Sequence, residues 1–494
     1  MAKFLRIIIL LAALPRVFAA QQVGGYDFTR ARSVIDSVMR ADRIPSIAVA
    51  VAKGDRILWE TGVGFANVER QLQATAHTPY SLASISKPFT ATGIMVLAQQ
   101  GLVRVTAPVN HYLGGARVVA REGNPDAMTL QRILTHTAGL PLHYQFFYQD
   151  AGYSRPPMDT TIRRYAVAVY PPGETYQYSN LGFGLLDYVI TRKSGMPYAD
   201  FMRREVFAPL GLTSTSVGVT SGPTGRHAER YDADNKPIPY YTFDHPGASE
   251  VYSSAHDLAR FGLFHLGARL PGQRQILARE TVQDMQRDVA RENPDATRGL
   301  GWGIRVVNGV RRVAHGGGMP GVSTMLALYP DEQVVIAVLL NKSVPSATEA
   351  VMTELAAIMM PRFAAGVRAR RAAGPPPAVE RPVLSPLHGE WRGFIHTYAD
   401  SVAVRLTSGA DSVTMAVANG APVRVDDVVF QRGMFSGRAE VQLPAPDLAR
   451  QPHRTLLWLR LQDGRLSGYA AAMTTTRRAY YALSSYIRLE RTAP

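Results

Sequence analysis

The order of apolar and polar positions divides the chain into a mixed N-terminal part and a C-terminal part composed of strands. Between Tyr26 and about Ala364, helical periodicity and strand-like alternation are interspersed. After Leu384, apolar residues recur at every second position, as at Val402 and Val404, and this spacing predicts strands with one buried face. Antiparallel strands of this number and spacing are typical of a small closed barrel.

Strands are predicted at both ends of the N-terminal part, with helices between them. The expected strands are Ile47–Val51 and Ile57–Trp59, separated by the turn Gly54-Asp55, and then residues 303–307, 324–329 and 334–340. The expected helices include residues 84–100, 181–193 and 255–266. This order predicts an α+β fold, in which an antiparallel sheet built from both ends of the domain is flanked by helices and is followed by a small all-β barrel.

The boundary between the two parts is predicted at residues 368–382, which form a linker rich in proline, alanine and arginine. Its centre has no apolar periodicity, and its prolines cannot continue a helix or a central strand. The two domains are therefore expected at residues 20–367 and 383–494.

The first residues are typical of a secretory signal. Lys3 and Arg6 precede an apolar run at residues 7–14, and small residues follow through Ala19 and Ala20. We predict a signal peptide at residues 1–19 and a periplasmic or secreted mature protein. No apolar stretch reaches the roughly 20 residues of a bilayer span, so no transmembrane span is expected after signal removal.

Composition narrows the possible functions. A chain of 494 residues with 46% hydrophobic and 19% charged residues can bury a large core and is not disordered. The formal charge of +15 comes mostly from scattered arginines, so no nucleic-acid partner is expected. Because there is no cysteine, disulfides and thiolate metal sites are excluded.

Ser84 and Lys87 are the first candidates for chemistry. They lie three positions apart at the start of a predicted helix, so the hydroxyl and the amine share one face. A nucleophile and its base need this proximity, and a helix N-terminus favours negative charge that develops nearby. The alternative is a helix cap followed by a surface lysine.

Tyr178 and Asn180 lie between the turn Pro171-Pro172-Gly173 and a predicted helix. A tyrosine at this point can relay a proton between the serine and a leaving group, and an asparagine amide can hold a substrate carbonyl. The alternative is a buried aromatic residue with Asn180 as the helix cap.

His315 differs from the other histidines that precede a glycine because it lies between two strand patterns. His265 falls in a predicted amphipathic helix, and His245 falls in an irregular loop. The glycines after His315 would let a substrate backbone approach a strand edge.

In this order, the motifs resemble the serine β-lactamase and penicillin-binding-protein superfamily, in particular its class C-like branch of esterases and D-aminopeptidase-type hydrolases. The segments that carry the resemblance are Ser84–Lys87, Leu134–Leu140, Tyr178–Gly182, Val251–Ser254, Asp257–Phe261 and His315–Gly321. The resemblance covers about residues 26–364. It implies an α/β sandwich of the β-lactamase/transpeptidase type with a helical subdomain.

The resemblance also implies the roles of the site residues. Ser84 would be the nucleophile, Lys87 and Tyr178 would share the proton transfers, and Asn180 would position the scissile group. His315 and Gly317 would contact substrate. The backbone N–H groups of Ser84 and Gly318 would form the oxyanion hole.

The sequence leaves open which group removes the proton of Ser84. Lys87 acts as a base at neutral pH only if its pKa falls by about three units, which burial and a second cation would supply. Alternatively, a charged Lys87 lowers the pKa of Tyr178, which then takes the serine proton. His136 is interpreted as a structural histidine bonded to backbone near a helix end.

The substrate class is predicted from the one position at which the motifs depart from the family pattern. Many relatives carry a lysine where this chain has His315, and a histidine is mostly neutral at pH 7. We therefore expect a serine hydrolase that cleaves an ester or a D-amino-acid-type amide or peptide bond. The alternatives are a class C-like β-lactamase or DD-carboxypeptidase, and a sensor or peptidoglycan-binding protein that is acylated without turnover.

The remaining expectations concern cofactors, partners and the second domain. No cofactor and no metal ion are expected, since no histidine pair has the spacing of a zinc hydrolase. The expected partner is a small-molecule or peptide substrate, with cell-wall fragments as a further candidate, and the oligomeric state is left open. The C-terminal part, with Trp391 near its first strand, resembles appended lipocalin-like barrels, which would restrict substrate size or support assembly.

Overall fold

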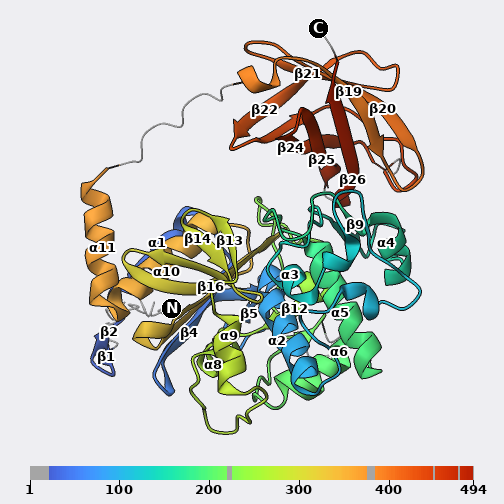
Figure 1. The fold of residues 1–494 in the computed structure, drawn as a ribbon. Coiled ribbons are helices and arrows are strands. Elements are labelled where there is room, and N and C mark those ends of the chain that lie inside the picture. Colours follow the sequence, from blue (N-terminus) through green and yellow to red (C-terminus); the bar gives the residue numbers. More distant parts are fainter. Residues whose placement is uncertain (1–21, 220–224, 375–383, 449–450, 477–478, 493–494) are drawn as a thin grey trace, which may run out of the picture.

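The structure is a computed structural model that describes residues 22–219, 225–374, 384–448, 451–476 and 479–492. The predicted signal peptide therefore lies outside the described residues, as does most of the predicted linker. Figure 1 shows an N-terminal domain of sheet and helices, and the C-terminal barrel in orange to red beside it. No helix in the described part of the chain combines the length and the apolar character that a membrane span requires.

The central sheet of the first domain has nine antiparallel strands in the order β13-β14-β15-β16-β17-β18-β3-β4-β5. The strands are β3 (Ser46–Lys53), β4 (Arg56–Asn67), β5 (Leu72–Gln73), β13 (Ala290–Asn293), β14 (Ala296–Arg298), β15 (Gly303–Val307), β16 (Val310–Met319), β17 (Val322–Tyr329) and β18 (Val334–Leu340). Pairing of β18 with β3 joins the two ends of the domain, as the sequence predicted.

Both faces of this sheet are buried, which explains the continuous apolar strands at its centre. In β3, Ile47, Val49 and Val51 face one hydrophobic cluster, while Ala48 and Ala50 face another. The first cluster includes helices α1 (Thr29–Ala41), α10 (Pro345–Met359) and α11 (Pro361–Ala372). The second includes α8 (Ala255–His265) and the helical part of the domain.

The helical part is inserted between β5 and β13. Besides α8, its helices are α2 (Ser86–Gln99), α3 (Leu130–Leu134), α4 (Met158–Tyr165), α5 (Asn180–Ser194), α6 (Tyr198–Phe201), α7 (Pro246–Ser249) and α9 (Arg279–Met285). Short strands complete it: β6 (Tyr80–Ser81), β7 (Val119–Ala120), β8 (Tyr144–Tyr148), β9 (Val167–Ala168), β10 (Ser216–Val217), β11 (Tyr241–Phe243) and β12 (Val251–Ser253). A two-stranded pair, β1 (Gln22–Val23) and β2 (Tyr26–Asp27), precedes α1.

The C-terminal domain is a closed barrel of eight antiparallel strands, and this confirms the sequence prediction. The strands are β19 (Gly389–His396), β20 (Ser401–Ser408), β21 (Val413–Val417), β22 (Val423–Gln431), β23 (Met434–Ala439), β24 (Arg454–Gln462), β25 (Arg465–Thr476) and β26 (Ala479–Arg491). They pair in sequence order, and β26 closes the barrel by pairing with both β19 and β25.

The two domains are joined by a strand pairing that the sequence did not predict. Strand β26 of the barrel pairs with β8 of the first domain, and β8 pairs in turn with β11. The predicted linker also begins later than the sequence indicated, because α11 continues to Ala372 and so includes five residues of the range 368–382. The helix can extend there because the first proline of that range is Pro375.

Candidate active site

Ser84 lies in a 3₁₀ turn, Ala83–Ile85, directly before α2 begins at Ser86. The sequence placed it at the start of the helix itself, so the helix begins two residues later than expected. The preceding Ala83 has φ of 49°, a left-handed conformation that costs a non-glycine residue about 1–2 kcal/mol. Within residues 81–90, Ser84 is the residue that keeps partial solvent exposure, so the turn presents its hydroxyl at the surface of a buried segment.

Lys87 is fully buried and lies among three oxygen atoms. Its Nζ is 3.2 Å from Ser84 Oγ, 2.7 Å from Asn180 Oδ1 and 3.1 Å from the carbonyl oxygen of Ala248. Burial, together with the positive charge of Arg298, holds the pKa of Lys87 well below its ordinary value. The predicted proximity of Ser84 and Lys87 is thus present, and Asn180 joins them.

Tyr178 completes this group, because its hydroxyl donates to Ser84 Oγ at 2.9 Å. Burial raises its pKa to about 12, although the bond to Ser84 and the charge of Arg298 oppose the rise. His136 stacks on the Tyr178 ring at 4.4 Å between centroids, and its Nδ1 accepts the backbone N–H of Ser179. This bond to backbone agrees with the structural role inferred for His136.

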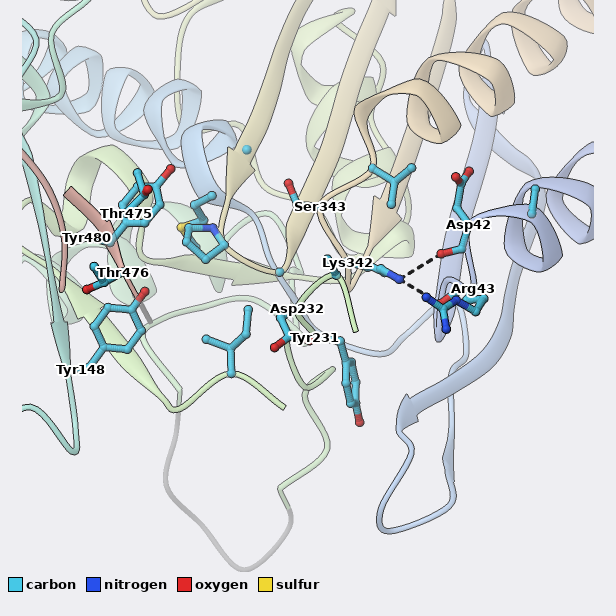
Figure 2. A pocket seen from close by; sticks show the side chains of 18 residues that line it. Asp42, Arg43, Tyr148, Tyr231, Asp232, Lys342, Ser343, Thr475, Thr476 and Tyr480 are labelled. Carbon is cyan, nitrogen blue, oxygen red and sulfur yellow. Dashed lines mark hydrogen bonds between the residues drawn. The ribbon is translucent and has the colours of Figure 1, made fainter. Parts of the chain in front are cut away.

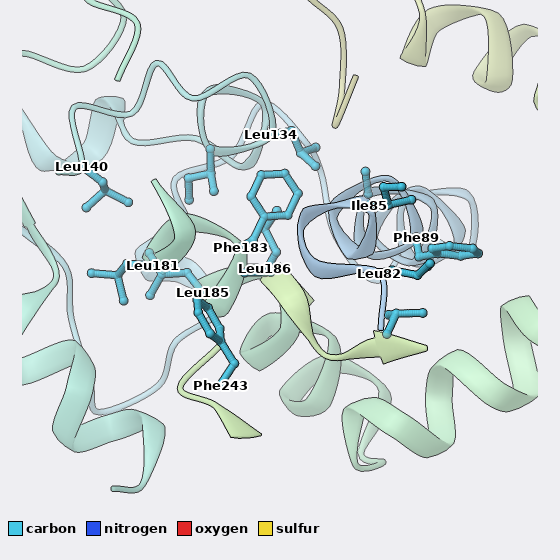
Figure 3. Close-up of a cluster of buried hydrophobic side chains, with 14 of the residues drawn as sticks. Leu82, Ile85, Phe89, Leu134, Leu140, Leu181, Phe183, Leu185, Leu186 and Phe243 are labelled. Atoms are coloured by element: carbon cyan, nitrogen blue, oxygen red, sulfur yellow. The ribbon is translucent and has the colours of Figure 1, made fainter. Parts of the chain in front are cut away.

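The helices beneath the site share one hydrophobic cluster. Figure 3 shows Leu82, Ile85 and Phe89 on the Ser84 segment close to α5, which contributes Leu181 and Phe183. Helix α5 is capped by Ser179, whose side chain accepts the N–H of Gly182, and not by Asn180. Asn180 is therefore free to direct its side chain to Lys87.

Strand β16 forms the other side of the site. His315, Gly316, Gly317 and Gly318 all belong to this one strand and pair with β17. A Cβ on Gly317 would lie 2.0 Å from the carbonyl oxygen of Leu82, so glycine is what allows the strand to pack against the turn that carries Ser84. Gly318 has nothing within 4 Å of its Cβ position and is exposed.

His315 is buried, and its Nδ1 lies 2.8 Å from the carbonyl oxygen of Gly316. Burial and the charges of Lys87 and Arg298 lower its pKa to about 3. The imidazole is therefore neutral throughout the ordinary pH range, even more so than the sequence suggested.

Arg298 is the site residue that sequence reasoning missed. It lies in a cavity of about 240 Å³ together with Ser84, Tyr178 and His315. Its Nη2 donates to the hydroxyl of Tyr176 at 2.6 Å, and its Nε lies 2.8 Å from Glu292. No motif marks Arg298 in an arginine-rich chain, so its position at the end of β14 becomes meaningful only when β14 is placed in the sheet.

A larger cavity of about 910 Å³ extends from Gly318 toward the barrel. Figure 2 shows Tyr148 and the barrel residues Thr475, Thr476 and Tyr480 on one side and Lys342 on the other. The Lys342 amine donates to the carbonyl oxygens of Asp42 and Arg43 and to Asn235 Oδ1. The barrel therefore forms part of the wall of a cavity that also includes Gly318, one of the two residues of the predicted oxyanion hole.

Comparisons with known proteins agree with this arrangement. The profile of the family described as Beta-lactamase matches residues 31–358. Penicillin-binding protein 4* of Bacillus subtilis is 27% identical over 317 residues, which are 60% of this chain and 67% of that protein. The chain thus spans about two thirds of the length of this curated relative.

Solved structures show the same fold. A class C beta lactamase from Rhodobacter sphaeroides matches with a TM-score of 0.55 and 23% identity, covering 69% of this chain and 99% of that one. The octameric penicillin-binding protein homologue from Pyrococcus abyssi matches with a TM-score of 0.57 and 20% identity, covering 93% of this chain and 99% of that one. The second match also spans the region of the barrel.

Proposed function

Because the chain belongs to the beta-lactamase family of serine hydrolases, we propose that it forms an acyl-enzyme on Ser84 and cleaves an ester or a D-amino-acid-type amide or peptide bond. The observation that carries the proposal is the contact of Ser84 Oγ with both Lys87 Nζ at 3.2 Å and the Tyr178 hydroxyl at 2.9 Å. A serine hydroxyl is a weak nucleophile unless an adjacent base removes its proton.

The proposed base is Lys87 in its neutral form. Asn180 Oδ1 and the Ala248 carbonyl oxygen can only accept hydrogen bonds, so they take the two N–H groups of a neutral amine. The lone pair then faces Ser84 Oγ, which is the third contact of Nζ. The lowered pKa of Lys87 and the raised pKa of Tyr178 both favour this assignment over a tyrosinate base.

The remaining steps follow from the same contacts. Ser84 Oγ attacks the scissile carbonyl carbon as its proton passes to Lys87 Nζ, and the tetrahedral oxyanion accepts from the N–H groups of Ser84 and Gly318. Tyr178 gives its proton to the leaving group and regains one from Lys87. Water then attacks the acyl carbon, and the same groups return the proton to Ser84.

The small cavity beside Ser84 combines guanidinium groups with the neutral His315. His315 is neutral, but Arg298, Arg305 and Arg312 line the same cavity as Ser84. Guanidinium groups bind carboxylates through paired hydrogen bonds. The three arginines can bind a substrate carboxylate and so keep DD-carboxypeptidase or β-lactamase activity as the second candidate function, while the neutral His315 favours D-aminoacyl amides and esters as the first.

The first experiment measures nitrophenol release from a short-chain nitrophenyl ester by the wild-type protein and by Ser84→Ala. We expect sustained turnover that is lost in the variant. Equal rates in the two proteins would remove Ser84 as the nucleophile. A burst of one equivalent that then stops would favour an acylated sensor over an enzyme.

The second experiment compares D-aminoacyl amides, D-aminoacyl esters and carboxylate-bearing β-lactams as substrates. We expect the first two classes to be hydrolysed more efficiently. His315→Lys should raise kcat/KM for the β-lactams, because it adds a fixed positive charge beside Arg298 that can hold the substrate carboxylate. An unchanged value would contradict this account of substrate selection.

A further inference from the structure

Three side chains of the types that bind metal ions meet inside the first domain, and none of them contacts Ser84. They are His143, directly before β8, and Asp244 and His245, directly after β11. Strands β8 and β11 pair with Phe146 opposite Phe243, so the three residues leave the same end of this two-stranded ribbon. The pairing thus brings together residues that are about 100 positions apart in sequence.

The distances between their ligand atoms fit a shared metal ion. Asp244 Oδ2 lies 3.4 Å from His143 Nε2 and 3.1 Å from His245 Nε2. Metal bonds of about 2.0–2.2 Å at tetrahedral angles place neighbouring ligand atoms about 3.3 Å apart. The two imidazoles and the carboxylate therefore already have the spacing of a coordination shell.

Hydrogen bonding leaves this group unsatisfied. The exposed fractions of His143, Asp244 and His245 are 1%, 6% and 0%. Both carboxylate oxygens of Asp244 and both ring nitrogens of His245 lack a hydrogen-bond partner among the described residues. A buried carboxylate whose oxygens accept no hydrogen bond costs several kcal/mol, so such groups ordinarily gain hydrogen-bond donors or bind a metal ion.

The neighbouring acids show that Asp244 is the exception. Asp187 accepts the backbone N–H of Gly247 at 2.7 Å, and Glu250 accepts that of Phe243 at 2.5 Å. Arg155 lies 3.4 Å from Glu250. Asp187 and Glu250 thus each accept a hydrogen bond, whereas the carboxylate oxygens of Asp244 accept none from the described residues.

The geometry points to a divalent metal site formed by His143, Asp244 and His245, a site that none of the family motifs includes. Two imidazole nitrogens and one carboxylate oxygen suit Zn²⁺ or another late first-row cation better than Ca²⁺ or Mg²⁺. The metal would fasten the β8–β11 ribbon to α7, whose Ala248 carbonyl contacts Lys87. Its role is structural, and it takes no part in the acyl-transfer steps.

A second cluster provides the matched control. Glu60, His77 and His256 also lie within coordinating distance, but at a partly exposed site where His256 Nδ1 already lies 2.8 Å from Glu60. The test protein is therefore the full chain carrying His77→Gln, which disables this second cluster. It is stripped with a chelator, loaded with Zn²⁺ alone and desalted, and its metal content is measured by mass spectrometry.

We expect one Zn²⁺ per chain in the wild-type and His77→Gln proteins, and at least about tenfold weaker Zn²⁺ affinity after Asp244→Asn or His143→Gln. Zn²⁺ should also raise the Tm of the stripped His77→Gln protein by at least about 2 °C. Absence of bound Zn²⁺ in His77→Gln, or equal affinity in Asp244→Asn, would overturn the proposal.

A second measurement leaves the three proposed ligands unchanged, so it tests the site even if Asp244→Asn and His143→Gln do not fold. X-ray absorption of Zn²⁺-loaded His77→Gln protein should show two imidazoles and a carboxylate oxygen in the first coordination shell. A shell with fewer than two imidazoles would exclude the buried site. The result is independent of ester hydrolysis, so it separates failure of this proposal from failure of the proposed function.

Discussion

Lys87 shows how single contacts set the chemistry of the site. It is fully buried and forms no ion pair with a carboxylate of the described residues, and its neighbours are two obligatory acceptors and the Ser84 hydroxyl. Burial is the main cause of its lowered pKa, and the Arg298 charge adds to the effect. Arg298 is thus the second cation that the sequence argument required but did not identify.

At the residue scale, the first prediction is a pH shift in Arg298→Met. Activity requires neutral Lys87, so kcat/KM rises as the pH passes upward through the lowered Lys87 pKa. Removal of the Arg298 charge raises that pKa, and the acid limb of the profile should move to higher pH. Arg298→Lys keeps the charge and should leave the limb near its wild-type position. A downward shift in Arg298→Met would contradict a lysine base.

The second prediction at this scale concerns two neighbouring tyrosines. Tyr178→Phe removes the hydroxyl that contacts Ser84, and kcat should fall by about 10²–10⁴-fold, as for other losses of acid–base catalysis. Tyr176 instead bonds Arg298, so Tyr176→Phe should retain most of the activity. Steady-state kinetics of both variants checks the assignment, and equal losses would refute it.

At the scale of elements, strand β16 and the Ser84 turn are held together at Gly317. Thr324 Oγ1 donates to the Leu82 carbonyl oxygen at 2.9 Å, and a Cβ on Gly317 would overlap both atoms. The approach of these two backbones is therefore what places the edge of β16 beside Ser84.

We expect Gly317→Ala to move β16 away from the turn, reduce kcat and lower the free energy of unfolding by about 1–3 kcal/mol. Gly318→Ala meets open space and keeps its N–H, so it should unfold like the wild type. Denaturant titrations and ester hydrolysis compare the two variants. Equal destabilisation by both would show that close packing at Gly317 is unimportant.

At the scale of the whole molecule, the barrel supports the segment that carries Tyr178. Tyr170 donates to the Trp458 carbonyl oxygen at 2.8 Å, and Gln177 Nε2 donates to the Tyr469 hydroxyl at 3.2 Å. Arg460 also contacts Glu174. Three barrel residues thus hold the eight residues before Tyr178, which gives the second domain a positioning role besides its place in the wall of the large cavity.

This role predicts that Tyr469→Phe lowers kcat by up to about tenfold with little change in Tm, because small displacements of a proton-relay group are costly. Arg454→Ala removes an exposed ion pair with Glu440 on the barrel surface and should leave kcat unchanged. A wild-type kcat in Tyr469→Phe would show that the barrel does not position Tyr178.

Local sequence patterns were enough to predict the main helices and strands and the pairing of Ser84 with Lys87. The continuous apolar residues of β3 and β18 and the apolar alternation of β20 are local signals, since each depends on neighbours a few positions away. Ser84 and Lys87 could be paired for the same reason, because three positions on a helical turn fix their proximity. Tyr178, Asn180 and His315 required the family resemblance, since nothing local links them to Ser84.

Tertiary structure alone decided the contacts between distant segments. Arg298 reaches the site through the order of β14, β15 and β16 in the sheet, and His143 meets Asp244 through the pairing of β8 with β11. The barrel joins the site through β26 and its neighbours. Which strands pair depends on burial and hydrogen bonding across the whole fold. The periodicity of the sequence therefore does not predict these contacts.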